Sequence, residues 1–287
     1  MPNTLFHASF AYMLGKELSC FSDDRTLNLF LLGSYGPDIF FYDRLPPTPF
    51  IPNQKHHGNL LHAAPSDKIA CSILKHADPS LLPFVYGFLT HIALDSTLHP
   101  YVCARTVGMD HTRFEGDLDS VIYDRYHNLI PFEKAICVPA EIEKIDLLIT
   151  DISLEVVNTG SRGAYKRSLN KLVRLYKFMY DPNEKRLRSI SAIERLFGKE
   201  CSLSGFLTGP GHHFFNDCMN ESHSVWIPKF FPGEEHTDSV DEMTEKANVL
   251  AKKLILAAKA YDFDLIKVLC SNRNMQDGPL PVSQTNS

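Results

Sequence analysis

The sequence lacks the cysteine patterns that mark disulfide-rich domains and zinc ribbons. Its seven cysteines are scattered along 287 residues, and none of them belongs to a C-x-x-C pair. An odd number of unpaired cysteines is typical of reduced, mostly buried thiols. The opening segment, MPNTLFHASFAYMLGKELSC, has no positively charged lead and no long apolar run, so no signal peptide is expected. Together these absences predict a cytoplasmic location.

Positive charge and long apolar runs are also scarce. The formal net charge is −5 and there is no polybasic run, so stable binding to nucleic acid or to an anionic membrane has little support. No segment reaches the roughly 18–20 consecutive apolar residues of a membrane span, so no transmembrane segment is expected. No G-x-S-x-G motif is present and no cysteine pairs obviously with a histidine, so a protein nucleophile is not expected. No pattern indicates an oligomeric state.

Helical periodicity dominates what the sequence does contain. Period-2 strand patterns are rare, and a hydrophobic content of 44% is sufficient for a large core. We predict an all-α fold with a single multi-helix domain over residues 1–270, followed by a disordered polar tail over residues 271–287. A loop rich in glycine and proline is expected after residue 33. The expected helices cover about residues 5–18, 24–32, 58–76, 81–99, 111–127, 140–157, 163–180, 187–197 and 240–270.

The most informative pattern is a set of metal-binding residue types at four-residue spacing. It reads His91-x-x-x-Asp95-x-x-x-His99 and, further on, His111-x-x-x-Glu115. On an α-helix, residues four apart share one face and lie about 5–6 Å apart at Cβ. Imidazole and carboxylate groups at that spacing are what zinc requires of its ligands. The spacing therefore predicts two ligand-bearing helix faces.

Asp95 supports a metal more strongly than any single histidine does. It lies inside an otherwise apolar helix, where an unpaired carboxylate would cost several kcal/mol of desolvation. No lysine or arginine occurs between Lys75 and Arg105, so no local basic partner is available. A bound cation is the economical solution, and a distant arginine is the alternative. A lone histidine is usually an ordinary core or surface residue, so it is the combination that favours a metal.

The order of these histidines and carboxylates resembles that of a known family. The order Gly87-x-x-x-His91-x-x-x-Asp95-x-x-x-His99, then His111-x-x-x-Glu115, preceded by an N-terminal histidine and a Gly-Pro-Asp loop, resembles the zinc-dependent phospholipase C family. Relatives of that family include secreted bacterial phospholipases C and the fungal and plant single-strand nucleases. The phrase FLTHIALDSTLHPYV is similar to the bacterial intracellular branch. The resemblance covers about residues 1–125 and implies an all-helical enzyme whose cleft holds zinc ions and hydrolyses phosphodiesters.

The resemblance also implies a ligand set for two or three Zn²⁺ ions. One zinc would be held by His91, Asp95, Asp38 and one histidine of the segment KHHGNLLH, for which His62 is favoured over His57, and His57 over His56. Asp95 would bridge to a second zinc bound by His7 and by the terminal amine and carbonyl. The third zinc would be bound by His99, His111 and Glu115, and Asp119 is a candidate for orienting a ligating histidine. The interval between Asp95 and His99 is shorter than in the secreted enzymes, so the third zinc is expected to have a different geometry.

The implied reaction is hydrolysis of a phosphodiester or phospholipid substrate by metal-activated water, with Asp38 as the candidate general base. Two alternatives stay open. The first is a nuclease-type phosphodiesterase, for which Phe40, Phe41 and Tyr42 would offer stacking surfaces while the charge balance is unfavourable. The second is a catalytically silent scaffold that binds zinc without turnover.

Overall fold

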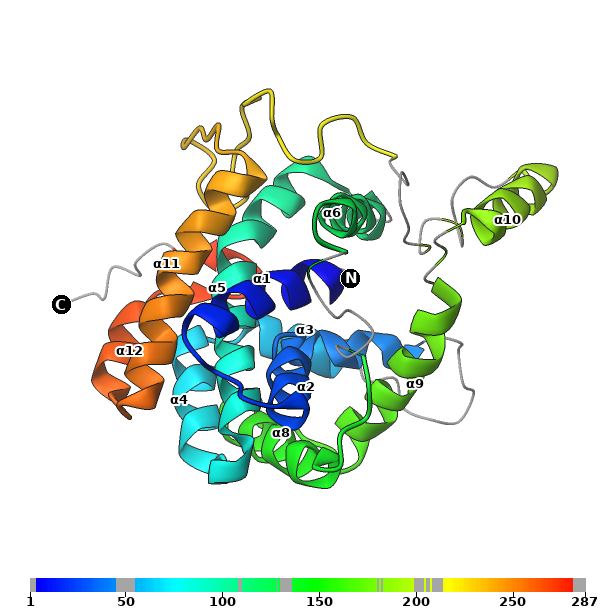
Figure 1. Ribbon diagram of the computed structural model, residues 1–287. Coiled ribbons are helices and arrows are strands. Elements are labelled where there is room, and N and C mark those ends of the chain that lie inside the picture. The colour runs from blue at the N-terminus through cyan, green and yellow to red at the C-terminus, as the bar shows by residue number, and fades with distance from the viewer. Residues whose placement is uncertain are drawn as a thin grey trace.

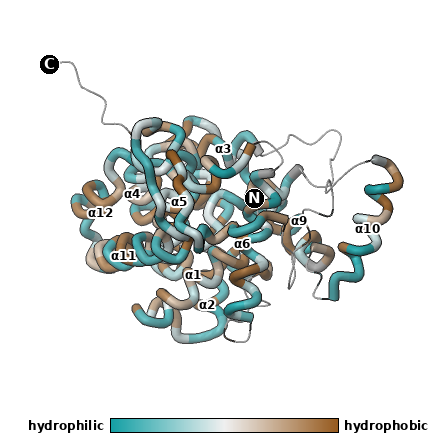
Figure 2. Tube along the Cα trace, turned by 90° about the horizontal axis from the view of Figure 1, so that it is seen from above, coloured by the Kyte–Doolittle hydropathy of each residue, from teal (hydrophilic) through white to brown (hydrophobic). Residues whose placement is uncertain are grey.

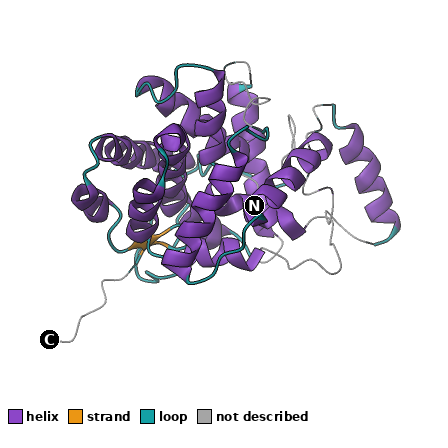
Figure 3. Ribbon diagram, turned by 90° about the horizontal axis from the view of Figure 1, so that it is seen from below, coloured by secondary structure: helices purple, strands orange, loops and turns teal. Residues whose placement is uncertain are grey.

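The computed structural model describes residues 4–44, 55–107, 110–127, 129, 136–179, 181, 183–198, 204, 207 and 214–280. In these parts of the chain almost all regular structure is helical, and the strands are limited to one short antiparallel pair (Figure 3). The prediction of an all-α fold is confirmed. The helices are α1 (Thr4–Glu17), α2 (Asp24–Gly33), η1 (Gly36–Arg44), α3 (Lys55–Ala63), α4 (Ser66–His76), η2 (Pro79–Leu81), α5 (Leu82–Arg105), α6 (Asp110–Tyr126), α8 (Ile142–Val157), α9 (Ala164–Met179), α10 (Lys185–Leu196), α11 (Val240–Lys259) and α12 (Phe263–Leu269), and the strands are β1 (Arg273–Asn274) and β2 (Gly278–Pro279).

Helix α5 is the central element of the core. It packs against α2, α11, α1 and α4 (Figure 1). Most of its side chains are buried. The contact with α2 is a backbone contact: a β-carbon at Gly87 would overlap the carbonyl of Phe30, and one at Gly33 would overlap the carbonyl of Phe84. Glycine at both positions lets α5 lie directly against α2, and the rest of the core forms around this pair.

The same stretch has the length and apolar composition of a membrane span. The segment Pro79–Arg105 would suffice to cross a membrane by length and mean hydropathy alone, so the expectation of no transmembrane segment stays a prediction. However, 72% of its most apolar stretch is buried inside the protein, as in the core helix of a soluble protein. Burial against α2 and α11 accounts for its hydrophobic character.

Helix α5 does not end at the His99–Pro100 bond, as the sequence predicts, but continues to Arg105. Proline removes one backbone donor and disfavours the helix interior. Here the following turn is held by tertiary packing, because Tyr101 and Val102 are buried and the Tyr101 hydroxyl donates to the carbonyl of Cys218 at 3.0 Å. The extension adds Cys103 to the face that carries His99.

Three other predicted boundaries are wrong for local reasons. The single helix expected over residues 58–76 is two helices, α3 and α4, because Pro65 precedes α4 and interrupts the backbone hydrogen bonding. The helix expected over residues 240–270 breaks where Tyr261 adopts a left-handed φ of 52° and Asp262 caps α12 by accepting from the Leu265 N–H. The first part of the expected loop after residue 33 is the 3₁₀ helix η1.

The predicted disordered tail is also wrong for residues 271–280. This segment forms the hairpin β1–β2, and Met275 between the strands is fully buried. This hairpin could not be predicted from the sequence, because two-residue strands leave no periodic pattern. Residues 281–287 lie outside the described part of the chain, and the assignment of residues 1–270 to one domain stays a prediction.

Helix α10 stands away from the other helices in two views at right angles (Figures 1 and 2). Hydrophobic and hydrophilic residues alternate along it (Figure 2). Its C-terminal end exposes Ile193, Leu196 and Phe197, whereas Glu194 is buried and accepts from the Ser204 hydroxyl at 2.6 Å. The candidate metal-binding residues all lie outside this helix.

Candidate metal centre

Four of the predicted ligands meet in the interior of the protein. Ligand atoms of Asp38, His62, His91 and Asp95 all lie within 4.8 Å of one another. They come from η1, α3 and α5, and the ring of His7 on α1 stacks beside His91 with a centroid separation of 4.4 Å. We call these five residues the Asp95 cluster.

Asp95 is the residue that connects the cluster. Its Oδ1 atom lies 3.2 Å from Nε2 of His7, and its Oδ2 atom lies 3.4 Å from Nε2 of His62 and 3.3 Å from Nε2 of His91. The second carboxylate, Asp38, places Oδ1 3.0 Å from Nε2 of His62 and Oδ2 3.9 Å from Nε2 of His7. Two carboxylates therefore face three imidazoles in a buried space.

Local backbone geometry explains how Asp38 reaches α5. Gly36 has a left-handed φ of 50°, and a β-carbon at this position would overlap the imidazole of His91. Glycine is the residue that tolerates both the conformation and the close approach. The turn that follows begins η1 and carries Asp38 toward Asp95. The Gly-Pro-Asp sequence thus brings the second carboxylate to the cluster.

Backbone carbonyls fix the protonation of two histidines in this cluster. Nδ1 of His62 lies 2.7 Å from the carbonyl of Gly58, and Nδ1 of His91 lies 3.1 Å from the carbonyl of Ser34. A carbonyl only accepts, so Nδ1 is the donor in both rings and Nε2 is left with a lone pair when the ring is neutral. This outer-shell arrangement is typical of metal-ligating histidines.

One buried atom tests whether the cluster fits a metal. His91 is fully buried, and its Nε2 atom makes no hydrogen bond to any described residue although it points toward Asp95. A buried, unsatisfied nitrogen is costly in a folded protein. A cation between the imidazoles and the two carboxylates would satisfy this nitrogen, so the donor set fits zinc.

In the absence of a metal, the charges in the cluster shift the pKa values strongly. Burial lowers the pKa of His91 to about 4, which keeps its ring neutral. Burial also opposes the charged form of His62, but hydrogen bonds to Asp38 and Asp95 outweigh it and raise the pKa of His62 to about 10. Although burial acts in the opposite direction, the surrounding histidines hold the pKa of Asp95 well below its usual value. Burial also opposes the charged form of Asp38, but His62 and His91 lower its pKa, so both carboxylates are available as anionic ligands.

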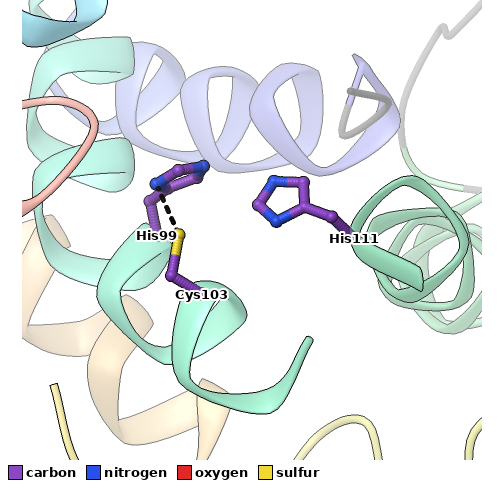
Figure 4. A group of neighbouring side chains, drawn as sticks. All are labelled: His99, Cys103 and His111. Carbon is purple, nitrogen blue, oxygen red and sulfur yellow. Dashed lines mark hydrogen bonds between the residues drawn. The ribbon is translucent and has the colours of Figure 1, made fainter. Parts of the chain in front are cut away.

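A second group of candidate ligands lies one to three turns further along α5. Ligand atoms of His99, Cys103 and His111 lie within 4.8 Å of one another (Figure 4). His99 and Cys103 project from α5, and His111 projects toward them from α6 (Figure 4). Glu115 is adjacent, with Oε1 3.2 Å from Nε2 of His111. We call His99, Cys103 and His111 the Cys103 cluster.

The environment of the Cys103 cluster favours a thiolate. Burial raises the pKa of the Cys103 thiol, but contacts with His111 and His99 outweigh it and lower that pKa to about 6. Burial opposes the charged form of His111, yet Glu115 and Cys103 raise the pKa of His111 to about 10. A thiolate and two imidazoles are ligand types that zinc prefers.

The C-terminal hairpin contacts both clusters through its backbone. The carbonyl of His62 accepts from the N–H groups of Met275 and Gln276, both at 3.1 Å, and the carbonyl of Gln276 lies 2.5 Å from Nδ1 of His99. The hairpin therefore touches one histidine of each cluster. His99 is thereby oriented in the same way as His62 and His91, with Nδ1 as the donor.

Some of the predicted site residues meet in the clusters, and others do not. Of the three histidines in KHHGNLLH, His62 lies in the Asp95 cluster, whereas His57 packs its ring against Phe40 at 5.2 Å and His56 is exposed. Asp119 contacts the backbone rather than an imidazole: it accepts from the N–H groups of Leu5 and Phe6, just before His7. The terminal amine lies outside the described residues.

One residue of the candidate site was missed by the sequence reasoning. Cys103 stands four residues after His99, so the signal His99-x-x-x-Cys103 was present in the sequence. The sequence predicts that the helix ends at Pro100, and residues four apart share a face only if the helix continues, so the pattern alone does not identify Cys103. The ligand assignments themselves stay predictions.

A predominantly helical fold with a buried cluster of imidazoles and carboxylates defines a candidate zinc protein, and comparison with known families identifies the class. The family model "Zinc dependent phospholipase C" matches residues 6–163, more than half of the chain. The chain belongs to the zinc-dependent phospholipase C family. Comparison with curated proteins and with solved structures gave no match. Family membership supports zinc as the metal, a phospholipase-like hydrolase as the class of activity and a phospholipid as the substrate class.

Proposed function

We propose that this protein hydrolyses the phosphodiester bond of a phospholipid headgroup with zinc held in the Asp95 cluster. The observation that carries the proposal is the convergence on Asp95 of three histidine Nε2 atoms, at 3.2, 3.3 and 3.4 Å. Bound zinc would supply a Lewis acid that activates water near neutral pH and neutralises charge on the phosphate oxygens. The family assignment supports the substrate class.

In this proposal, the residues of the Asp95 cluster have distinct roles. His62, His91 and His7 supply imidazole ligands. Asp95 directs Oδ1 toward His7 and Oδ2 toward His62 and His91, which suits a ligand that bridges two ions. Asp38 is partly accessible, with 16% of its side chain exposed, and it is the more exposed of the two carboxylates. It is therefore the better placed to take a proton from an attacking water as general base.

We assign the third zinc ion to His99 and His111 of the Cys103 cluster, with Glu115 beside them. The proposed total is two or three zinc ions per chain. The carbonyl contacts to His62 and His91 act as orienting groups, because each fixes the ring plane and directs Nε2 toward the Asp95 cluster. A cytoplasmic location remains the expectation drawn from the sequence.

The proposal is tested by stripping the protein of metal, reloading it with Zn²⁺ and measuring hydrolysis of three substrates. These are bis-p-nitrophenyl phosphate, phosphatidylcholine in mixed micelles, and single-stranded DNA. Zinc-dependent release of phosphocholine, lost in Asp95→Asn, is the expected result. Hydrolysis of the DNA alone would favour the nuclease alternative. Stoichiometric zinc without turnover of any substrate would contradict a hydrolase and favour a scaffold.

A further inference from the structure

The two clusters differ in one chemically decisive ligand type. The Asp95 cluster offers nitrogen and oxygen donors, whereas the Cys103 cluster includes a sulfur. Oxygen-rich sites also accept Mg²⁺, Mn²⁺ and Ca²⁺, while thiolate ligands select zinc and other soft or borderline ions. The Cys103 cluster should therefore select zinc over Mg²⁺, Mn²⁺ and Ca²⁺ more strongly than the Asp95 cluster does.

The position of Cys103 is set by the helix and not by a flexible loop. His99 and Cys103 lie one turn apart on α5, and Sγ of Cys103 lies 3.5 Å from Nδ1 of His99. Buried Tyr101 and Val102 anchor this turn in the core beyond Pro100. The thiol is thus held on the face that carries His99.

The partner histidine approaches from a second helix. The ring centroids of His99 and His111 are 5.0 Å apart with an interplanar angle of 65°, and Nδ1 of His111 lies 3.2 Å from Oγ1 of Thr106. Two helices therefore deliver three donors to one point (Figure 4). Nδ1 of His99 lies near both the Gln276 carbonyl and Sγ of Cys103, so a metal beside this thiol can bind Nδ1 in place of the carbonyl contact, or bind Nε2 of the same ring.

From this geometry we infer that Cys103 is a zinc ligand, so that His99, Cys103 and His111 form a thiolate-containing metal site with Glu115 or water in the fourth position. The inference rests on the proposed function in taking zinc as the metal of this protein. It assigns the site a donor set of two nitrogens and one sulfur, in place of two nitrogens and one carboxylate oxygen. Zinc with three protein ligands keeps one position for an additional donor.

The test uses the full chain, stripped of metal and reloaded with Co²⁺ alone, which reports its ligands in its absorption spectrum. A sulfur-to-cobalt charge-transfer band in the near ultraviolet is expected for the wild type. The band should be lost in Cys103→Ser and kept in Cys71→Ser, a matched change at a partly buried thiol on α4. A wild-type spectrum without the band, or a band that survives in Cys103→Ser, would overturn the inference.

Two further measurements make the result independent of folding defects and of the hydrolase proposal. His111→Ala keeps all seven thiols but removes a partner ligand, so it too should lose the band. X-ray absorption of the zinc-loaded wild type should show a sulfur neighbour at about 2.3 Å, and its absence would contradict the site. Asp95→Asn should keep the band although turnover is lost. In the wild type, a band without turnover would contradict the hydrolase proposal and support the thiolate site, whereas turnover without a band would contradict the thiolate site and support the hydrolase proposal.

Discussion

Nε2 of His91 lies 3.3 Å from Oδ2 of Asp95, one helical turn away on α5. The histidine is fully buried, and its other ring nitrogen is engaged by the Ser34 carbonyl. A carboxylate buried beside a neutral imidazole requires further positive charge, which two additional histidines supply only when they are protonated. Zinc would supply that charge permanently. We therefore expect this pair to be the centre of a metal site.

Asp95→Asn should remove the zinc of the Asp95 cluster and nearly all turnover. The amide removes the negative charge from the residue that three imidazoles approach, and it cannot bridge two cations. Turnover should fall by at least about 100-fold, because loss of an outer-shell partner alone costs roughly 10–100-fold. Zinc content by mass spectrometry and hydrolysis of bis-p-nitrophenyl phosphate are the measurements.

Asp146→Asn is the matched control for this change. Asp146 is a buried carboxylate that holds the start of α9 by accepting from the N–H groups of Gly163 and Lys166. Its amide variant should have a lower Tm but keep its zinc. Equal zinc content in the Asp95 variant and the wild type would contradict the assignment of Asp95.

His62→Ala should impair metal binding, whereas His57→Ala should impair packing. His62 lies 3.0 Å from Asp38, so its loss should reduce zinc content and turnover. His57 packs against Phe40 and should affect mainly stability, by about 1–3 kcal/mol. Parallel zinc analysis and thermal unfolding of the two variants would distinguish these effects. A larger zinc loss at His57 would reverse the assignment.

Gly36→Ala should weaken metal binding through His91. A β-carbon at residue 36 would overlap the imidazole of His91, so either the ring or the loop that carries Asp38 must move. The measurement is the zinc affinity of the variant, determined by competition with a chromophoric chelator.

Gly198→Ala controls for the backbone strain in that variant. Gly198 also has a left-handed φ, of 62°, but no described atom lies within 4 Å of the added β-carbon. Both variants should lose about 1–2 kcal/mol of stability from the conformation itself. Only Gly36→Ala should lose zinc affinity, and equal affinities would show that the His91 contact is unimportant.

Chelation should lower the Tm, and the difference should widen with pH. In the metal-free protein, protonated His62 compensates Asp38 and Asp95, because the pKa of His62 is raised from 6.5 to about 10. This stabilisation is complete below pH 6.5 and is lost as the pH rises through about 10, whereas zinc binding tightens as protons are removed. Calorimetry with zinc and with chelator, from about pH 7 to about pH 9, measures the difference. A gap that narrows with rising pH would contradict this role of His62.

The parts of the candidate site that follow from helical spacing could be predicted from the sequence. His91 and Asp95 share a face because four residues make one turn, and the unusual position of a carboxylate within an apolar helix is visible without coordinates. The same reasoning identified the all-α fold. The Gly-Pro-Asp loop and His62 came from resemblance to a family and not from periodicity.

The remaining features depend on tertiary contacts that no local pattern encodes. Helix α5 passes Pro100 because Tyr101 is anchored in the core, and this continuation is what brings Cys103 beside His99. The hairpin around Met275 lies more than 170 residues from His99, and its contact with that ring is made by a backbone carbonyl, which every residue type provides. Such contacts leave no signature in the sequence.

Anomalous diffraction at the zinc absorption edge, from a crystal of the zinc-loaded protein, would locate the metal ions. We expect a peak between Asp95, His91, His62 and Asp38, and a separate peak among His99, Cys103 and His111. Absence of zinc beside Asp95 in a zinc-saturated crystal would show that the Asp95 cluster is not a metal site.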